Sequence, residues 1–281
     1  MKSEKISIII ACYNDHEYIE KAVQSAIDQT YENKEIIVVD DGSNAKTKAI
    51  LKELEPRINL LITQNNLGVS AARNKGIEAA IGRFVLILDS DDFFEPTFCE
   101  KAIKAFQKNS DIKIVTCYVN WFNSFNNSVT FKPDGGTVKD ALINNVAMGS
   151  SMFRKHDWQL VGGYDQSMLE GYEDWEFYLR LLKNGGKAEV IPEVLFNYRN
   201  KKNSRNKKAN LAKYQLLEYI YIKHADVYKE HFNFFIHEWL ESNRKSEAFK
   251  QQVMDSLDYK IGHKLLKPFR LMGFFKMKNK L

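Results

Sequence analysis

The N-terminal third of the chain alternates between short apolar runs and segments with helical spacing, and this alternation constrains the fold more than any other feature. Runs rich in Ile, Val and Leu predict strands near residues 6–11, 35–39, 58–62 and 84–88. Between these runs, apolar residues recur every three or four positions, as on one face of a helix. Apolar strands separated by helices are typical of a parallel sheet covered on both faces. The sequence therefore predicts a βαβαβαβ unit.

The rest of the chain predicts a more mixed structure, with a turn at the sequence PDGG. The expected elements are a helix over 96–107, a strand at 112–118, a helix from about Glu173, and two short strands at 187–191 and 194–198. From about Ala209 the pattern is helical and rich in aromatic residues. We expect these last helices to be amphipathic and to pack on the domain that precedes them.

Composition and cysteine usage indicate a folded protein from a reducing compartment. Apolar residues make up 44% of the chain and aromatic residues 12%, which argues against general disorder. Cys12, Cys99 and Cys117 form no C-x-x-C pair, so we expect reduced thiols. The apolar run at 6–12 is too short for a signal peptide, and no run reaches the roughly 18 apolar residues of a membrane span. We therefore expect a cytoplasmic protein, or one peripheral to the inner face of the cell membrane.

Positive charge is concentrated in the C-terminal part of the chain. Residues 201–281 carry 18 Lys and Arg against 8 Asp and Glu, and no acid follows Asp258. Leu and Phe residues are interleaved with the last cations, a composition typical of a segment bound to anionic lipid. A disordered basic terminus and a homodimer contact are the alternatives. No nucleic-acid-binding motif accompanies the charge, so we expect no nucleic-acid partner.

Acidic residues follow two of the predicted strands. Asp40 and Asp41 end one strand, and Asp89, Asp91 and Asp92 end another. Ligands of open parallel sheets bind outside the carboxyl ends of the strands. Asp89 and Asp91 point the same way in an extended segment, and paired carboxylates suit Mg²⁺ or Mn²⁺ together with a diphosphate. The alternative is a solvated turn in which Ser90 or Asp92 caps the following helix.

The turn after the first strand excludes two common nucleotide sites. It reads ACYNDHEYIEKA and lacks the glycines of the dinucleotide and Walker motifs. Phosphate charge would therefore have to be met by a metal ion and by basic side chains. Tyr13 could stack on a base, or it could form part of the core or rim.

Several stretches together resemble the glycosyltransferase family 2 proteins. They are ISIIIACYND, SAIDQTYENKEIIVVDDGS, NNLGVSAARNKGIEAA, GRFVLILDSDD, GSSMFRK and GGYDQSMLEGYEDWEFYLRL. The resemblance implies an α/β GT-A fold, which is Rossmann-like, with a mixed, mainly parallel sheet flanked by helices. It implies a catalytic domain over 1–205, with a nucleotide-binding half at 1–95 and an acceptor-side half at 96–205. A helical, basic C-terminal extension then covers 206–281.

The resemblance also implies residue roles. The implied donor-binding residues are Ala11, Tyr13, Asp40, Asp41, Arg73, Asp89, Ser90, Asp91, Lys201 and Lys202. Asp41 would contact the base, with Tyr13 flanking the ring. The D-x-D match makes Asp91 the stronger metal ligand, accompanied by Asp89 and Asp92, for Mn²⁺ or Mg²⁺.

The match to the family's ED motif implies that Asp174 is the catalytic base and that Glu173 supports the loop or touches the acceptor. Displacing a diphosphate from an anomeric carbon requires the acceptor hydroxyl to lose its proton, and a positioned carboxylate can take it. The alternative is structural, because acids in the first turn of a helix stabilise its dipole.

One departure from the family concerns the loop after the YR sequence. Many members carry a histidine there, whereas this chain reads YRNKKNSRNKK. Lys201, Lys202 or Arg205 could meet the diphosphate instead, or the loop could be solvated, and the third metal ligand is left open. We expect a structural role for His156.

The expected function is a metal-dependent inverting glycosyltransferase that moves a sugar from a nucleotide-diphosphate sugar, a UDP-sugar by family analogy, to a hydroxyl of a glycan or lipid-linked acceptor. The alternatives are a nucleotidyltransferase and a non-catalytic nucleotide-sugar-binding or membrane-docking protein of the same fold. The sugar, the acceptor and the linkage depend on loops that composition does not resolve.

Overall fold

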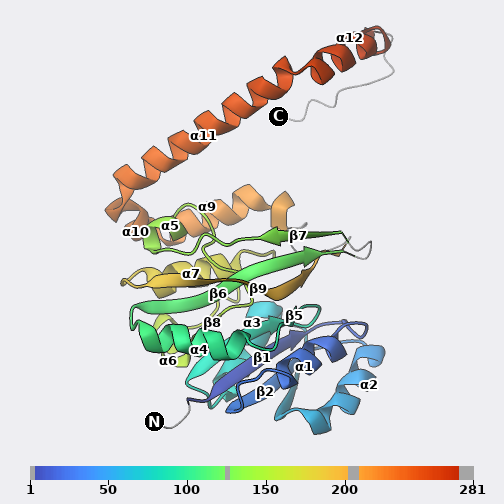
Figure 1. The fold of residues 1–281 in the computed structure, drawn as a ribbon, viewed down its shortest axis with the longest axis vertical. Helices are drawn as coiled ribbons and strands as arrows, with labels where there is room; N and C mark the ends of the chain where they lie inside the picture. The colour runs from blue at the N-terminus through green and yellow to red at the C-terminus, as the bar shows by residue number, and fades with distance from the viewer. Residues whose placement is uncertain (1–3, 124–126, 202–208, 272–281) are drawn as a thin grey trace. The chain divides into compact units, whose positions relative to one another are not determined.

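The computed structural model describes residues 4–123, 127–201 and 209–271. The chain divides into two compact units, Met1–Glu230 and His231–Leu281. In the first unit, helices flank a large sheet (Figure 1). Its strands are β1 (Ile6–Cys12), β2 (Lys34–Asp41), β3 (Leu60–Gln64), β4 (Phe84–Asp89), β5 (Phe93–Phe94), β6 (Ile112–Phe122), β7 (Ser128–Phe131), β8 (Met152–Arg154) and β9 (Lys187–Arg199). Its helices are α1 (Ile19–Ile27), α2 (Ala45–Leu54), η1 (Glu55–Arg57), α3 (Val69–Ala79), α4 (Phe98–Lys108), α5 (Val138–Ala141), α6 (Lys155–Val161), α7 (Glu173–Leu182), α9 (Lys213–Lys223) and α10 (Ala225–Glu230).

The sheet is mixed and mainly parallel in its N-terminal half, as the sequence predicts. Its strand order is β3-β2-β1-β4-β8-β6-β9-β5, with β7 paired to β6. β3, β2, β1 and β4 run parallel to one another, whereas β8 pairs antiparallel with both β4 and β6. The predicted βαβαβαβ unit is therefore confirmed, and β8 joins it to the second half of the sheet.

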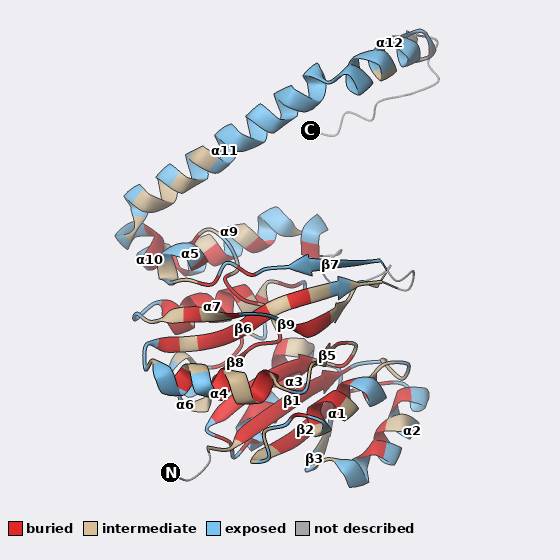
Figure 2. Ribbon diagram, in the orientation of Figure 1, coloured by how far each residue is buried: buried red, intermediate tan, exposed pale blue. Residues whose placement is uncertain are grey.

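Alternate residues of β1 pack into two different layers of the core. Ile8 and Ile10 join a cluster with Val23 of α1, Leu51 of α2 and Phe98 of α4. Burying an Ile or Leu side chain completely contributes roughly 1.5–3 kcal/mol. β1 is buried along its whole length, and β2 and β4 are buried at all but one residue each (Figure 2), because helices cover both faces of the parallel part of the sheet.

α3 packs on the opposite face, where a glycine permits close contact. A Cβ placed on Gly76 would lie 2.5 Å from Ile9 Cγ2 and 3.1 Å from Val39 Cγ2. Ile9 points away from Ile8 and Ile10 because successive strand residues face opposite sides. The missing side chain at Gly76 therefore lets α3 lie directly on β1 and β2.

The two short strands expected at 187–191 and 194–198 form a single strand, β9. Its pairing with β6 steps from Cys117↔Ile191 to Tyr118↔Val194, so the residues between them fall outside the regular register. The sequence break at Pro192 is a β-bulge or irregularity within a continuous strand rather than a connection. Pro cannot donate a ladder hydrogen bond and is tolerated at such irregularities.

Three further strands carry little signal in the sequence. β5 and β8 are two and three residues long, too short for a period of two to show. All four residues of β7 are exposed, so no buried face marks this strand.

The helices after residue 209 belong to different units. α9 and α10 fall in the first unit, which ends at Glu230. Charged side chains tie both helices to α7: Asp226 of α10 lies 2.8 Å from Lys183 at the end of α7, and Lys223 of α9 lies 2.8 Å from Glu176 of α7. α11 (Phe232–Asp255) and α12 (Leu257–Leu271) form the second unit.

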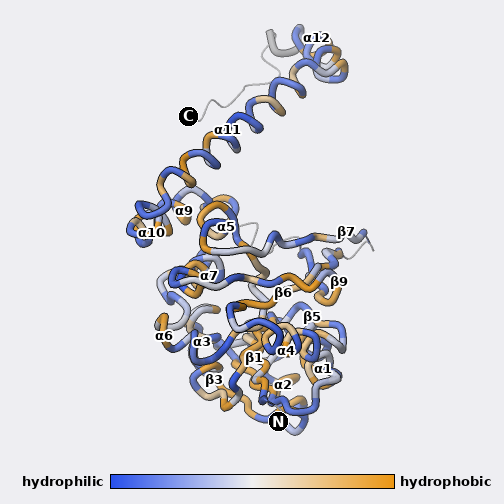
Figure 3. Tube along the Cα trace, turned by 60° about the vertical axis from the view of Figure 1, so that its left-hand side comes forward, coloured by the Kyte–Doolittle hydropathy of each residue, from blue (hydrophilic) through white to orange (hydrophobic). Residues whose placement is uncertain are grey.

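α11 has no buried residue. Polar and apolar residues are interspersed along both helices of its unit (Figure 3). Among the helices that the structure describes, none combines the length and the apolar run that crossing a bilayer requires. All three cysteines are free and buried, as expected. Burial raises the pKa of each of these thiols to about 12.

Candidate active site

The strand pairing brings the predicted donor residues to one edge of the sheet. Cys12 of β1 pairs with Asp40 of β2, and Ala11 pairs with Asp89 of β4. The carboxyl ends of β1, β2 and β4 are therefore neighbours, and the segments that follow these strands leave the sheet at the same edge. Tyr13, directly after β1, keeps 49% of its surface exposed. The side chain is therefore available to a ligand rather than part of the core.

Asp40 and Asp41 organise the loops at this edge. Asp40 Oδ1 accepts a hydrogen bond from the Ser43 amide at 2.9 Å. Asp41 accepts bonds from the amides of Leu67 and Gly68, both at 2.9 Å, and these residues lead into α3. Both carboxylates are almost completely buried. Their hydrogen bonds fix the backbone of the loops that follow β2 and precede α3.

Arg73 of α3 connects two acids that lie far apart in the sequence. Its Nη2 lies 2.7 Å from Asp89 Oδ1, and its Nη1 lies 2.9 Å from Glu173 Oε1. The Arg73 side chain is only 1% exposed. Burial alone would lower the pKa of Arg73, but the two carboxylates outweigh it and raise that pKa well above its usual value. A permanently charged guanidinium therefore joins the end of β4 to the start of α7.

Asp91 faces a different cation. Lys201 Nζ lies 2.7 Å from Asp91 Oδ2 and 2.7 Å from Asp15 Oδ1. Asp15 Oδ2 in turn accepts a hydrogen bond from Ser90 Oγ at 2.6 Å. Burial raises the pKa of Asp91, Lys201 opposes that rise, and Asp89 adds to it. The segments after β1, β4 and β9 are thus linked by charge at one point.

The side chain of Asp92 is the buried carboxylate of the acidic turn. Its Oδ1 accepts the Arg199 amide at 2.7 Å, and its Oδ2 is buried without a hydrogen-bond partner among the described residues. Burial, followed by repulsion from Asp91 and Asp89, raises the pKa of Asp92 well above its usual value. Neither Asp92 nor Ser90 caps α4, which begins after Thr97 without a side-chain cap. The solvated-turn interpretation therefore does not describe this segment.

Asp174 lies in the first turn of α7, beside Gly149. Its Oδ2 accepts a hydrogen bond from Asn145 Nδ2 at 3.0 Å, and its Oδ1 accepts one from the Trp175 amide at 2.8 Å. A Cβ placed on Gly149 would lie 3.2 Å from Asp174 Oδ2 and 3.7 Å from Arg73 Nη2. Asp174 and the guanidinium bound to Asp89 therefore adjoin one another across Gly149. The backbone before α7 is unusual, because Tyr172 has a φ of 61°.

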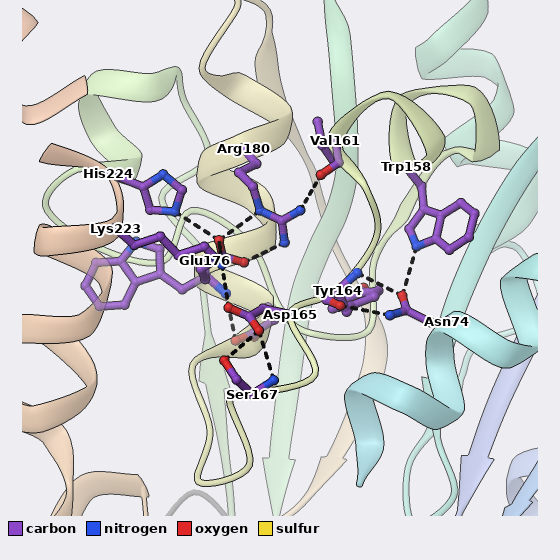
Figure 4. Close-up of polar contacts among 12 residues, drawn as sticks. Asn74, Trp158, Val161, Tyr164, Asp165, Ser167, Glu176, Arg180, Lys223 and His224 are labelled. Atoms are coloured by element: carbon purple, nitrogen blue, oxygen red, sulfur yellow. Dashed lines mark hydrogen bonds and ion pairs between the residues drawn. The ribbon is translucent and has the colours of Figure 1, made fainter. Parts of the chain in front are cut away.

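The other acids of this helix have structural partners. Glu173 is buried against Arg73. Glu176 accepts hydrogen bonds from Arg180 and from His224, and Lys223 joins Glu176 to Asp165 (Figure 4). Burial alone would raise the pKa of Glu176, but the hydrogen bonds from His224 and Arg180 hold it at about 2. This network fastens α7 to α9 and α10, the helices that follow the catalytic segments.

A second set of contacts in Figure 4 fixes the loop ahead of α7. Asn74, next to Arg73 on α3, accepts hydrogen bonds from the Tyr164 amide at 2.8 Å and from Trp158 Nε1 at 3.1 Å. The Tyr164 ring lies below Arg73, with its centroid 5.4 Å from the guanidinium carbon. α3 therefore positions both the buried cation and the loop that leads to Asp174.

Several expectations concern residues away from this cluster. Lys202 and Arg205 lie outside the described residues. His156 lies on α6 with a side chain that is 74% exposed, 3.9 Å from Asp157, and it does not join the acidic cluster. Asp15 and Asn145 were not selected from the sequence. Asp15 follows the first strand by three residues, a position that could have identified it, whereas Asn145 lies in a polar loop without a distinguishing pattern.

The residues fit a divalent cation held by few protein ligands. The donors at the acidic turn are carboxylate oxygens, including the unpartnered Oδ2 of Asp92, and such oxygens suit Mg²⁺ and Mn²⁺. No group of three His, Cys, Asp or Glu residues in the described part of the chain is arranged as a metal cage. Mg²⁺ commonly takes one or two carboxylates and completes its shell with water and phosphate oxygens. Each acid of the turn has a partner, Arg73 for Asp89, Lys201 for Asp91 and the Arg199 amide for Asp92, so a bound cation would replace or join one of these contacts.

The fold is shared with solved glycosyltransferase structures. Residues 1–349 of S. aureus TarS in complex with UDP align with a TM-score of 0.60 at 18% identity, covering 82% of this chain and 72% of that one. The same TarS fragment in complex with UDP-GlcNAc aligns with a TM-score of 0.60 at 19% identity, covering 72% and 60%. The protein therefore shares the GT-A fold of these structures.

Sequence comparison gives the family. The model described as glycosyl transferase family 2 matches residues 7–156, and a model described as the N-terminal domain of galactosyltransferase matches residues 142–203. An uncharacterized glycosyltransferase of Methanocaldococcus jannaschii is 29% identical over 249 residues, 85% of each chain. TuaG of Bacillus subtilis, whose name assigns it as a glycosyltransferase to teichuronic acid biosynthesis, is 32% identical over 204 residues, covering 71% of this chain and 80% of that one. The chain belongs to glycosyl transferase family 2.

Proposed function

We propose that the protein is a metal-dependent inverting glycosyltransferase that transfers a sugar from a UDP-sugar to a hydroxyl group of a glycan or lipid-linked acceptor. The observation that carries the proposal is that Asp174 and the Arg73–Asp89 pair both lie beside Gly149, with Asp174 Oδ2 and Arg73 Nη2 at 3.2 Å and 3.7 Å from a Cβ placed on this glycine. The carboxylate of Asp174 therefore lies near the arginine that pairs with the acidic turn. The TarS complexes with UDP and UDP-GlcNAc support the choice of donor.

The nucleoside part of the donor is assigned to the ends of β1 and β2. Tyr13 is exposed there and can stack on the base. Asp40 and Asp41 are already fixed by backbone amides, so a contact to base or ribose would use a rigid surface and lose little conformational entropy. The diphosphate would then lie near Asp91 and Lys201. A divalent ion bound by Asp91 supplies stabilisation of the charge that develops on the leaving diphosphate.

Asp174 is assigned as the general base. Asn145 and the Trp175 amide orient its carboxylate, and Arg73 keeps a positive charge near its Oδ2. The acceptor hydroxyl approaches the anomeric carbon opposite the diphosphate and gives its proton to Asp174, and its oxygen forms the new glycosidic bond as the bond to the phosphate oxygen breaks. Attack from the opposite side inverts the anomeric configuration. Glu173 acts through Arg73 and does not touch the reacting atoms.

We also propose that the acceptor is a cell-surface polysaccharide precursor and that the protein is cytoplasmic, held at the inner face of the membrane by its last helix. The name of TuaG supports the acceptor class. α12 exposes the apolar residues Leu257, Ile261 and Leu265, and the cations among them suit anionic lipid. Flotation with phosphatidylglycerol vesicles would support this placement, whereas a dimer on light scattering and no flotation would refute it.

The donor assignment is tested by thermal stabilisation. UDP with Mn²⁺ should raise the melting temperature of the wild-type protein, because a ligand that binds the folded state stabilises it. Asp91→Ala should abolish the Mn²⁺-dependent part of that shift, whereas the exposed Asp226→Asn should retain it. A full Mn²⁺-dependent shift in Asp91→Ala would contradict the metal assignment. UDP binding without transfer to any acceptor would instead favour a non-catalytic nucleotide-sugar-binding protein.

A further inference from the structure

The ammonium group of Lys201 lies between two carboxylates that follow adjacent parallel strands. Its Nζ is 2.7 Å from Asp91 Oδ2 and 2.7 Å from Asp15 Oδ1. Asp15 is held in turn by Ser90 Oγ at 2.6 Å. A positive charge of the chain itself therefore lies beside the carboxylate that we assign to the metal.

We propose that Lys201 exchanges partners during donor binding: it neutralises Asp91 and Asp15 in the free protein, and it leaves Asp91 for the diphosphate when the metal and nucleotide bind. The proposal rests on the assignment of Asp91 as metal ligand and of the diphosphate to this edge. Lys201 would therefore affect the affinity for the metal ion and the affinity for the nucleotide in opposite directions.

Electrostatic repulsion between the two cations favours such an exchange. Mg²⁺ binds oxygen ligands at about 2.0–2.1 Å, and an ammonium group kept 2.7 Å from the same carboxylate would repel it strongly at this partly buried position. The described residues form no cage of three metal ligands that could outweigh this repulsion. The incoming phosphates carry the negative charge that allows both cations to remain in the site.

The side chain has the freedom to move. Lys201 is 28% exposed, and its two partners are 20% and 22% exposed, so the group is not enclosed by packing. Its stem is flexible, unlike the fixed fork of an arginine. Nζ also lies 4.8 Å from the centroid of the Tyr18 ring, a cation–π contact that can remain when Asp91 is released.

The first test measures Mn²⁺ binding without nucleotide, from the electron paramagnetic resonance signal of free Mn²⁺. Lys201→Met should bind Mn²⁺ roughly tenfold more tightly than the wild type, because the competing charge is gone. Lys201→Arg keeps that charge and should bind like the wild type. Lys101→Met is the matched control, since Lys101 pairs with Glu193 and is 33% exposed, and it should also bind like the wild type.

The second test measures UDP binding with saturating Mn²⁺ by calorimetry. Lys201→Met should bind UDP several-fold more weakly, because the diphosphate loses a charged partner. Opposite changes in the two affinities are the signature of the exchange, which a merely structural lysine would not produce. Equal Mn²⁺ affinities in Lys201→Met and wild type would refute the role of Lys201 and leave the metal requirement intact. Absence of Mn²⁺ binding in both proteins, even with UDP, would instead refute the metal requirement of the proposed function.

Discussion

Replacing Glu176 with Gln should destabilise the protein strongly, because its carboxylate is the common acceptor of a buried network. The side chain is 0% exposed, and its oxygens lie 2.8 Å from Arg180 Nε, 2.8 Å from Lys223 Nζ and 2.9 Å from His224 Nε2. Glutamine keeps the size but removes the charge and one acceptor, so the cations Arg180 and Lys223 lose their counter-charge. Removing one partner of a buried ion pair typically costs about 3–5 kcal/mol.

The pKa of Glu176 gives an independent magnitude. Relative to its ordinary value of 4.5, the network holds this pKa at about 2, which corresponds to about 3 kcal/mol of stability at neutral pH. Because the pKa is lowered in the folded state, this stability is present above pH 4.5 and is lost as the pH falls toward 2. Both routes therefore predict that Glu176→Gln loses about 3 kcal/mol at pH 7 and less in acid.

Urea unfolding followed by tryptophan fluorescence measures the effect at pH 7 and at several values down to pH 3. The midpoint should fall with little change in the slope, and the gap to the wild type should narrow as the pH is lowered. Glu100→Gln is the control, because Glu100 is exposed and pairs with Lys104 across one helical turn, and its midpoint should not move. A Glu176→Gln loss below 1 kcal/mol at pH 7, or a gap that does not depend on pH, would refute this reasoning.

Two further substitutions test the packing and the charge of the site. Gly76→Ala should lower the free energy of unfolding by about 1–2 kcal/mol in urea, because overpacking against Ile9 exceeds the gain in helix propensity. The control Gly262→Ala should lose no stability, because a Cβ at this position would have no atom within 4 Å. Equal losses in the two variants would contradict the close approach of α3. Arg73→Met should cost about 3–5 kcal/mol at pH 7, because Asp89 and Glu173 lose their shared buried cation, and a wild-type melting temperature in calorimetry would argue against a structural role for that cation.

The central strands were predictable because helices cover both of their faces. Every residue of β1 is buried, and so is every residue of β2 after Lys34, which leaves continuous apolar runs in the sequence. The exposed β7 and the three residues of β8 have no such pattern. β9 was predicted as two strands because Pro192 interrupts its register without ending it.

The acidic edge was predictable for a similar reason, since Asp41 and Asp89 are the last residues of β2 and β4, two buried strands that both pair with β1. The ion pairs of the site were not predictable from the sequence. The pairs of Arg73 with Glu173 and of Lys201 with Asp15 join segments that are distant in sequence. Asn145 shows the same limit, as its contact to Asp174 arises from how a polar loop packs on α7. Residues that end strands leave a local pattern, whereas residues that orient them depend on tertiary packing.

The role of Asp174 as general base is tested most directly by comparing transfer with donor binding in Asp174→Asn. Asparagine can replace the hydrogen-bonding shape of the side chain but cannot take the acceptor proton, so transfer should fall by about 10²–10⁴-fold, while the Kd for UDP with Mn²⁺ stays at the wild-type value. Transfer within tenfold of the wild type, with the same Kd, would show that Asp174 is not the base.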